Sequence, residues 1–262
     1  MATPVDPRGR FSGLARGYAQ HRPSYPDATV DWLIEASGVG PGALVADVGC
    51  GTGILTRLLA RRGLRVVGID PNEEMLAEAR AAGGTAEYRH GEAAATGLGD
   101  ASVALVTAAQ AFHWFDVDAA LAEFHRVLVS GGRAAAIWNM RGDGTLMTAY
   151  DALLRRFSGE YTVLDSWEST LERLRAHPLV ESPLRHDAPN VQSFDFEGLH
   201  GRAWSSSYVS RGVRDREGFD AALRALFDAH ARSGHVEFSY RTVSFLFRIA
   251  APGASAGSTD RR

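Results

Sequence analysis

The sequence predicts an α/β fold built on a doubly wound parallel sheet, and three observations carry this prediction. Strand-like and helix-like stretches alternate through the first half of the chain, which is typical of βαβ units in a parallel sheet. The first strand runs into a turn with three close glycines, as in sheets that bind ligands at their carboxyl edge. A length of 262 residues with 45% hydrophobic content is enough for one large domain with a sizeable core.

The expected elements of this core follow one another between residues 44 and 138. Strands are predicted near Leu44–Val48, Arg65–Asp70, Ala86–Arg89, Val103–Ala109 and Arg133–Trp138. Helices are predicted between them, near Leu55–Arg62, Asn72–Ala82 and Val117–Leu128. Together these repeats make a doubly wound sheet.

The pattern changes after Asn139. Helices are expected near Thr145–Phe157 and Ser166–Arg175, before a strand candidate near Val191–Phe196. Further helices are expected near Leu199–Val209 and Glu217–Ser233, and the alternating run Val236–Ile249 predicts a long final strand. Residues 1–9 and 251–262 are small, polar and rich in Gly or Pro, so we expect disordered ends there.

The glycine turn indicates the kind of ligand. Gly49, Gly51 and Gly53 form Gly-x-Gly-x-Gly, whereas a dinucleotide-binding turn needs its third glycine at the position of Ile54. A second acid, Asp70, ends the next strand, where a carboxylate can accept hydrogen bonds from both ribose hydroxyls. The pattern favours a nucleoside cofactor without pyrophosphate, and the alternative for Asp70 is a helix N-cap ahead of a proline.

Composition and charge narrow the class of function. The net charge is −3 and the chain has no basic cluster, which argues against nucleic acid and favours a small-molecule substrate. No segment resembles a leader or a membrane span, so we expect a cytoplasmic protein. Cys50 is the single cysteine and no Cys/His group has metal spacing, so we expect no metal. All 28 basic residues are arginine, which indicates a GC-rich bacterial source.

Several motifs together resemble the class I S-adenosylmethionine-dependent methyltransferases, in particular their small-molecule branch, which includes trans-aconitate methyltransferase. The motifs are the glycine turn, Tyr18 with the run 21–26, the run Ala109 to Asp116, and Arg126-Val127-Leu128 with Gly131-Gly132 and Trp138-Asn139. The resemblance covers roughly residues 10 to 250. It implies a Rossmann-like seven-stranded sheet with an antiparallel edge strand. It also implies an N-terminal lid over 10–38, a cofactor-binding core over 39–140, and inserted helices, an acceptor pocket and the final strands over 141–250.

The resemblance further implies which residues hold S-adenosylmethionine. Asp47 and the glycine turn are expected at the methionine part, Asp70 at the ribose, and Pro71 with Met75 at the adenine. The loop after the third strand departs from the family pattern, because Ala94 stands where a glutamate is usual; backbone atoms, water or Glu92 are then left for the adenine amino group. Arg22 is expected to clamp the cofactor carboxylate or a substrate acid, or to form a structural ion pair. The full expected set is Tyr18, Arg22, Asp47, Gly49, Cys50, Gly51, Gly53, Asp70, Pro71, Met75, Glu92, Ala93, Ala94, Gln110, Ala111 and Phe112.

The acceptor site is expected from three clusters. His113 is the candidate catalytic base, since its unperturbed pKa suits proton transfer at neutral pH; the alternative is that it packs under the cofactor and bonds a backbone carbonyl. Trp204 and its neighbours either line the acceptor pocket or serve packing alone. The expected substrate-binding residues are Phe11, His21, Tyr25, His113, Trp114, Asn139, Trp204, Ser207 and Tyr208.

The expected reaction is in-line methyl transfer to an oxygen, carboxylate or hydroxyl, of a small metabolite. Alignment and desolvation supply most of such catalysis, so a base is optional. Nitrogen or carbon acceptors of a secondary-metabolite pathway stay open, as does a non-catalytic cofactor-binding protein. The glycine spacing argues against an NAD(P)-dependent oxidoreductase.

Overall fold

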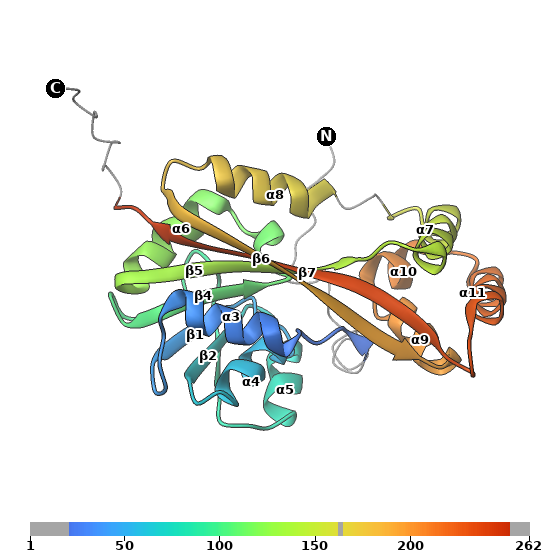
Figure 1. The fold of residues 1–262 in the computed structure, drawn as a ribbon, viewed down its shortest axis with the longest axis horizontal. Coiled ribbons are helices and arrows are strands. Elements are labelled where there is room, and N and C mark those ends of the chain that lie inside the picture. The colour runs from blue at the N-terminus through green and yellow to red at the C-terminus, as the bar shows by residue number, and fades with distance from the viewer. Residues whose placement is uncertain (1–20, 162–164, 252–262) are drawn as a thin grey trace.

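A computed structural model describes residues 21–161 and 165–251 of the chain and contains a seven-stranded sheet (Figure 1). The strand order is β3-β2-β1-β4-β5-β7-β6. The first five strands pair in parallel, and β7 runs antiparallel to both of its neighbours. This confirms the predicted doubly wound sheet with an antiparallel strand toward one edge. The strands are β1 (Leu44–Val48), β2 (Arg65–Asp70), β3 (Glu87–His90), β4 (Val103–Ala109), β5 (Leu128–Arg141), β6 (Val180–Phe194) and β7 (Val236–Ile249).

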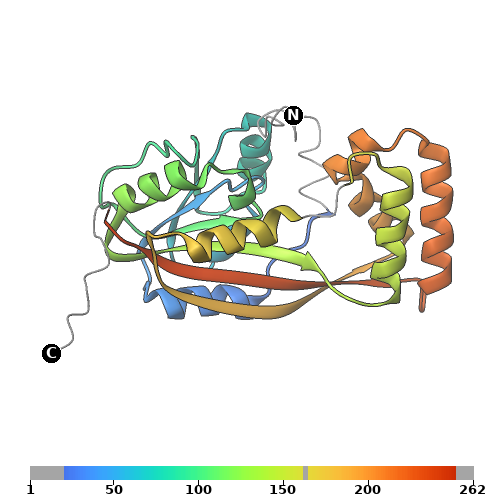
Figure 2. The ribbon, with the colours of Figure 1, turned by 90° about the horizontal axis from the view of Figure 1, so that it is seen from above.

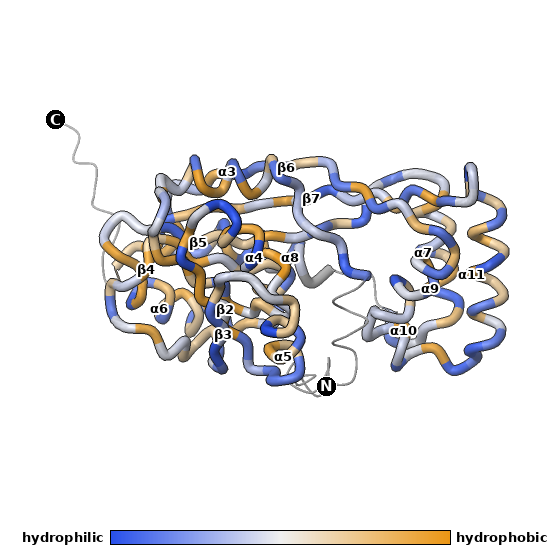
Figure 3. Tube along the Cα trace, turned by 90° about the horizontal axis from the view of Figure 1, so that it is seen from below, coloured by the Kyte–Doolittle hydropathy of each residue, from blue (hydrophilic) through white to orange (hydrophobic). Residues whose placement is uncertain are grey.

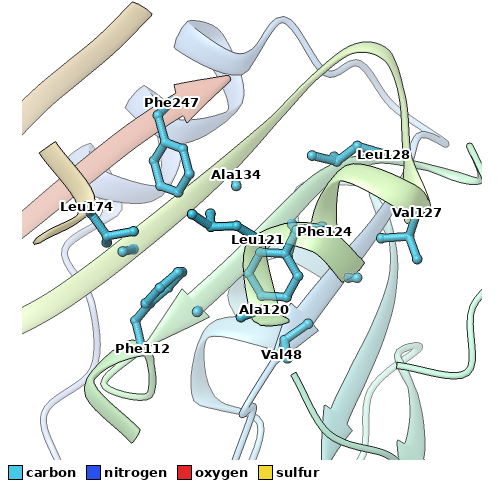
Figure 4. Close-up of a cluster of buried hydrophobic side chains, with 14 of the residues drawn as sticks. Val48, Phe112, Ala120, Leu121, Phe124, Val127, Leu128, Ala134, Leu174 and Phe247 are labelled. Atoms are coloured by element: carbon cyan, nitrogen blue, oxygen red, sulfur yellow. The ribbon is translucent and has the colours of Figure 1, made fainter. Parts of the chain in front are cut away.

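Helices cover both faces of the sheet. On one face, α3 (Asp27–Ser37) and α4 (Ile54–Ala60) bury leucine and valine side chains against the strands. On the other face, α6 (Val117–Val127) and α8 (Asp165–Ala176) bury the aromatic and aliphatic cluster in Figure 4. The short α5 (Glu73–Ala81) contacts β2 and β3. This two-sided burial explains why the central strands read as nearly continuous apolar runs.

The three longest strands, β5, β6 and β7, extend beyond the core and carry a second lobe (Figures 1 and 2). Four helices pack there around a separate apolar cluster that includes Tyr150, Phe219 and Phe238. Figure 3 shows apolar stretches alternating with polar ones along these helices, as one-sided burial requires. The helices are α7 (Thr145–Phe157), α9 (Phe196–Trp204), α10 (Ser207–Gly212) and α11 (Arg216–His230).

The first described helix, α3, packs against the sheet. Helix α3 falls within the segment 10–38, yet it contacts β5, β6 and β7 and buries Val30 and Leu33 in the core. Its apolar side explains this, because a helix with one apolar stripe is most stable against a sheet. Of the described part of the segment, Arg22, Pro23 and Tyr25 line the cavity introduced below. Residues 10–20, the expected disordered end 1–9 and residues 252–262 lie outside the described residues.

The prediction for β6 was wrong in its extent. We expected a strand near Val191–Phe196, but β6 begins at Val180, and its register shifts between Glu181 and Leu184. Pro183 and Pro189 interrupt the strand signal in the sequence. They are tolerated because β6 is the edge strand, where a missing N–H faces no partner.

The helix expected over Leu199–Val209 is in fact two helices. Helix α9 ends at Trp204, and α10 begins at Ser207 after Ser206 adopts an extended backbone. The Ser206 hydroxyl accepts a hydrogen bond from Arg202 Nη1 at 2.9 Å. This contact helps to hold the break between the two helices.

Candidate active site

A cavity of about 960 Å³ lies between the carboxyl ends of the parallel strands and the second lobe. Its lining reaches from the glycine turn after β1 to Tyr208 on α10 and Tyr240 on β7. The expected site residues that line it are Arg22, Tyr25, Asp47, Gly49, Cys50, Gly51, Asp70, Pro71, Met75, Glu92, Ala93, Ala94, Gln110, Ala111, His113, Trp114, Asn139, Ser207 and Tyr208. Most of the residues expected from the sequence are therefore brought together around one space.

Two glycines of the turn have different surroundings although both have positive φ. A Cβ on Gly49, with φ of +69°, would lie 2.5 Å from the Ala111 Cβ. A Cβ on Gly51, with φ of +54°, meets no atom of the described residues within 4 Å. Gly49 is thus required by packing between two loops, whereas Gly51 keeps space beside the cavity.

Asp47 is buried at the end of β1 and is held by two threonines. Its carboxylate accepts hydrogen bonds from Thr56 Oγ1 at 2.6 Å and from Thr107 Oγ1 at 2.8 Å. Burial raises the pKa of Asp47 to about 6, although both threonine hydroxyls act in the opposite direction. Asp47 therefore joins β1, α4 and β4 behind the glycine turn.

Asp70 connects two loops that line the cavity, the glycine turn after β1 and the segment between β2 and α5. One carboxylate oxygen accepts the backbone N–H of Gly51 at 2.8 Å, and the other accepts that of Asn72 at 2.9 Å. The N-cap of α5 is Asn72, whose side chain accepts from the backbone N–H groups of Glu74 and Met75. Asp70 does not cap this helix, and a carboxylate has lone pairs beyond the two used here. Burial raises its pKa above the ordinary value.

The loop after β3 is held by an ion pair behind it. Glu92 and Ala95 exchange backbone hydrogen bonds of 3.2 and 3.0 Å, which closes a tight turn. The next residue, Thr96, donates its N–H and its hydroxyl to Glu123 on α6, and Arg126 pairs with the same carboxylate at 2.7 Å. The loop is thereby held with Glu92, Ala93 and Ala94 at the cavity.

The loop after β4 lines the cavity and contains a residue with a strained backbone. Gln110 has φ of +55°, which disfavours most residues other than glycine. Its Nε2 donates to the Asn139 carbonyl at 3.1 Å, and Asn139 in turn donates to the carbonyl of Ser24. Phe112, expected at the cofactor, points into the core instead (Figure 4), because η1 (Phe112–Trp114) turns its ring toward Phe124.

His113 lines the cavity and contacts a buried tryptophan. Trp138 Nε1 lies 3.4 Å from His113 Nδ1 and donates to it. An indole nitrogen is a donor only, so Nδ1 must accept and the neutral imidazole carries its proton on Nε2. This tautomer makes His113 a hydrogen-bond donor at Nε2, which does not favour the expected role as a base.

The wall formed by the second lobe contains two arginines that the sequence analysis missed. Arg141 Nη2 donates to Tyr161 Oη, and Arg202 donates from Nε to Tyr240 Oη at 2.9 Å. Both guanidinium groups line the cavity. Arg141 ends β5, so the rule that ligands bind at the carboxyl ends of strands was a usable signal. Arg202 is on a helix after the core, and no sequence signal pointed to it.

Four of the expected residues within the described chain lie outside the cavity lining. Gly53 packs against Tyr88, where a Cβ would lie 2.5 Å from its hydroxyl. His21 lies against Gly201 of α9. Trp204 donates to Asp220 at 2.8 Å and packs on Phe219, so its ring belongs to the lobe core. Phe112 is the fourth, and Phe11 and Tyr18 lie outside the described residues.

Two further features concern the ionisable side chains and the thiol of the described residues. Residues 21–161 and 165–251 contain no group of three or more His, Cys, Asp or Glu side chains arranged to hold a metal ion. Burial raises the pKa of the Cys50 thiol, which opposes a nucleophilic role. No helix within these ranges is long and apolar enough to cross a membrane.

The fold and the site define an α/β protein with a cavity at the carboxyl edge of its parallel strands. Comparisons with known proteins give the family. Residues 46–136 match the family profile of a methyltransferase domain. A methyltransferase-like protein of Schizosaccharomyces pombe, itself uncharacterized, is 35% identical over 94% of this chain and 97% of its own length. The chain belongs to the class I S-adenosylmethionine-dependent methyltransferases; the narrower trans-aconitate branch stays a prediction.

Other relatives agree at lower coverage or identity. The chain spans about half the length of an uncharacterized methyltransferase of Mycobacterium tuberculosis, with 43% identity over 51% of this chain and 53% of that protein. A solved structure from Anaeromyxobacter dehalogenans, assigned to the type II methyltransferases, has a TM-score of 0.64 and 29% identity over 87% of this chain and 97% of its own.

Proposed function

We propose that this protein transfers the methyl group of S-adenosylmethionine to an oxygen of a small-molecule acceptor bound in the cavity. The observation that carries the proposal is that one cavity joins the glycine turn and Asp70 to the aromatic wall of the second lobe. A cofactor at the first end, beside the glycine turn, and an acceptor at the second end, beside the second lobe, then share one cavity. This closeness is what an in-line displacement requires.

The residues at the first end fit the cofactor. Gly51 keeps the space beside the turn clear for a ligand, and the Asp70 carboxylate is held in place by two backbone N–H groups. We assign Asp70 to the ribose hydroxyls, and Met75 and Pro71 to the adenine. When bound, the cofactor supplies a methyl group activated by positive sulfur. The chain's part is to align the acceptor with that group and to exclude water.

The tautomer of His113 bears on the kind of acceptor. With Nδ1 engaged by Trp138, the neutral ring donates from Nε2 and does not receive a proton there. A hydroxyl or amine acceptor gains from a base, whereas a carboxylate is already ionised at neutral pH. The arrangement therefore favours a carboxylate oxygen over a hydroxyl as the methyl acceptor.

The first test is a calorimetric titration of the protein with S-adenosylhomocysteine, beside NAD and NADP. We expect saturable binding of S-adenosylhomocysteine alone, and at least about tenfold weaker binding by Asp70→Asn, because hydrogen bonds to charged groups are worth about 1.5–3 kcal/mol. Asp228→Asn is the matched control, since its exposed carboxylate pairs with Arg224 on α11. Binding of a nicotinamide cofactor instead would overturn the proposal. If S-adenosylhomocysteine binds as expected, a mass-spectrometric screen for the gain of one CH₂ unit would identify the acceptor.

A further inference from the structure

We infer that the acceptor carries an anionic group, a carboxylate or a phosphate, which Arg202 and Arg141 bind in the wall of the second lobe, away from the glycine turn. The inference rests on the proposed function for calling the ligand an acceptor. The anion site itself follows from the surroundings of the two guanidinium groups.

Arg202 is a buried cation without a carboxylate partner among the described residues. The residue is 4% exposed, and its side-chain hydrogen bonds go to two neutral hydroxyls, those of Tyr240 and Ser206, both at 2.9 Å. A guanidinium remains charged in proteins. A buried charge is costly unless it is paired, since its desolvation is not offset. Arg202 therefore has a binding capacity that the described chain does not use.

Arg141 lies on the same wall and is only partly compensated. Its nearest carboxylate oxygen, from Asp151, is 3.9 Å away, and the same carboxylate pairs with Arg155 at 2.7 Å. Its Nη1 is buried and has no hydrogen-bond partner in the described chain. A buried donor without a partner costs about 1–3 kcal/mol, so a ligand oxygen that accepted from it would be favoured.

Three partly exposed arginines, by contrast, have carboxylate partners close by. Arg62 contacts Asp27 and Asp31 at 2.7 and 2.5 Å, and Arg126 contacts Glu123 at 2.7 Å. Arg185 pairs with Asp187 at 2.8 Å. Arg202 is more buried than these three arginines, yet it has no carboxylate partner among the described residues. Its counter-ion is therefore expected to arrive with a ligand.

The tyrosines around Arg141 and Arg202 also indicate a positive electrostatic potential on this wall. Tyr208 lines the cavity, with its ring 5.2 Å from that of Tyr161. Burial alone would raise the pKa of Tyr208, but Arg141 and Arg202, with Arg22, hold it below the ordinary value. A surface that favours a phenolate also favours a carboxylate or phosphate, for which arginine provides bidentate hydrogen bonds.

The test compares charged and neutral probes that share a phenyl ring, on protein saturated with S-adenosylhomocysteine. Calorimetry with phenylacetate against phenylacetamide, and with phenyl phosphate against phenol, measures the preference for each anion. We expect at least one anion to bind at least about tenfold more tightly than its neutral counterpart. The tighter of the two anions tells a carboxylate-bearing acceptor from a phosphate-bearing one. Equal binding of charged and neutral probes would overturn the inference.

Variants separate the anion site from the cofactor site. Arg202→Met should remove the anion preference, leave the affinity for S-adenosylhomocysteine within about twofold, and leave the melting temperature of the ligand-free protein unchanged or higher, because an unpaired buried charge is removed. Arg141→Met is the second variant should the first not fold. Arg224→Met, which stacks on Phe196 outside the cavity, is the matched control.

The outcomes also distinguish the two proposals. Failure of the wild-type protein to bind S-adenosylhomocysteine would contradict the proposed function. The anion preference would in that case be measured on the ligand-free protein, so the anion site is still tested. Normal cofactor binding with unchanged anion affinity in both arginine variants would contradict the anion site alone.

Discussion

The two ends of the cavity differ in how completely the chain satisfies its own charged groups. At the glycine turn, Asp47 and Asp70 each accept two hydrogen bonds from the chain itself. In the second lobe, Arg202 has no carboxylate partner among the described residues, and Arg141 shares one. The first end is therefore shaped before any ligand binds, whereas the second depends on a ligand for part of its compensation.

This difference separates two uses of buried charge. A carboxylate that accepts backbone N–H groups determines the course of a loop, as Asp70 does for the segments at Gly51 and Asn72. A guanidinium whose hydrogen bonds go to neutral hydroxyls, as those of Arg202 do, keeps much of its desolvation cost, since neutral partners offset little of it. The former supports the shape of a site, and the latter supplies its specificity.

The largest expected effect tests the shaped end, by replacing each of two glycines with alanine. Gly49→Ala should destabilise the fold by about 3 kcal/mol or more, because its Cβ overlaps Ala111 at 2.5 Å in a left-handed conformation. Gly51→Ala should cost only about 1–2 kcal/mol from its positive φ, yet weaken S-adenosylhomocysteine at least about tenfold. Urea unfolding measures the loss of stability in each variant, and calorimetry measures the affinity for S-adenosylhomocysteine. Similar effects of both variants on unfolding and on binding would contradict the distinction.

The second prediction concerns the pH dependence of the Asp47 carboxylate. Its pKa is about 6 in the folded protein against an ordinary value of 3.8 in the unfolded chain, so the folded state binds more protons between these values. Its stabilising contribution is complete below pH about 3.8 and is lost as the pH rises through about 6. The loss is at most about 3 kcal/mol, from about two pKa units.

Asp47→Asn isolates this contribution, because other carboxylates titrate in the same range. We expect the unfolding free energy of the wild type, minus that of the variant, to fall as the pH rises from about 4 to about 7. Denaturant unfolding at several pH values measures it. A difference that does not vary with pH would mean that Thr56 and Thr107 hold the carboxylate at its ordinary pKa.

The third prediction concerns the buried indole of Trp138 in the cavity lining. Trp138→Phe removes the N–H that His113 Nδ1 accepts, so we expect the His113 ring to change from the pure Nε2–H tautomer to a mixture of both. Nitrogen NMR of the histidine rings measures this. The lost packing of a fully buried side chain should cost about 1–3 kcal/mol. His125→Gln is a control for assigning the signal, and an unchanged His113 tautomer in Trp138→Phe would contradict the contact.

The smallest expected effect concerns an ordinary paired arginine. Asp31→Asn removes one of the two carboxylates beside Arg62, at the surface of α3, where the Asp31 side chain is 64% exposed. We expect a loss of less than about 1 kcal/mol, since exposed ion pairs contribute little. Unfolding in denaturant at low and high salt measures it. A larger loss would mean that surface pairs matter here, which would weaken the contrast with Arg202.

Much of the fold was predictable because its core elements have strong local signals. The bounds of β1, β2, β4, β7 and α7 agree with the sequence prediction, since each is an apolar or amphipathic run with a clear period. The extent of β6 was not predictable, because its two prolines carry a signal against a strand that only its edge position makes harmless.

The residues at the cavity were most predictable beside the glycine turn. Gly49, Gly51 and Asp70 stand next to predicted strands, where parallel sheets bind ligands, and the structure places all three at the cavity. Phe112 was expected there too, but a residue in a short loop turns inward or outward according to what packs against it, and Phe124 and Phe115 complete an aromatic cluster on the inner side.

The sequence by itself determined the family, the succession of most strands along the chain and the glycine turn after β1, because these depend on residues adjacent in the chain. The tertiary structure alone decided which charges are compensated. Asp47 meets a threonine 60 positions away, and Arg202 meets Tyr240 38 positions away. Whether a buried charge has a partner depends on distances across the folded chain, and electrostatic energy follows those distances and not the spacing in sequence.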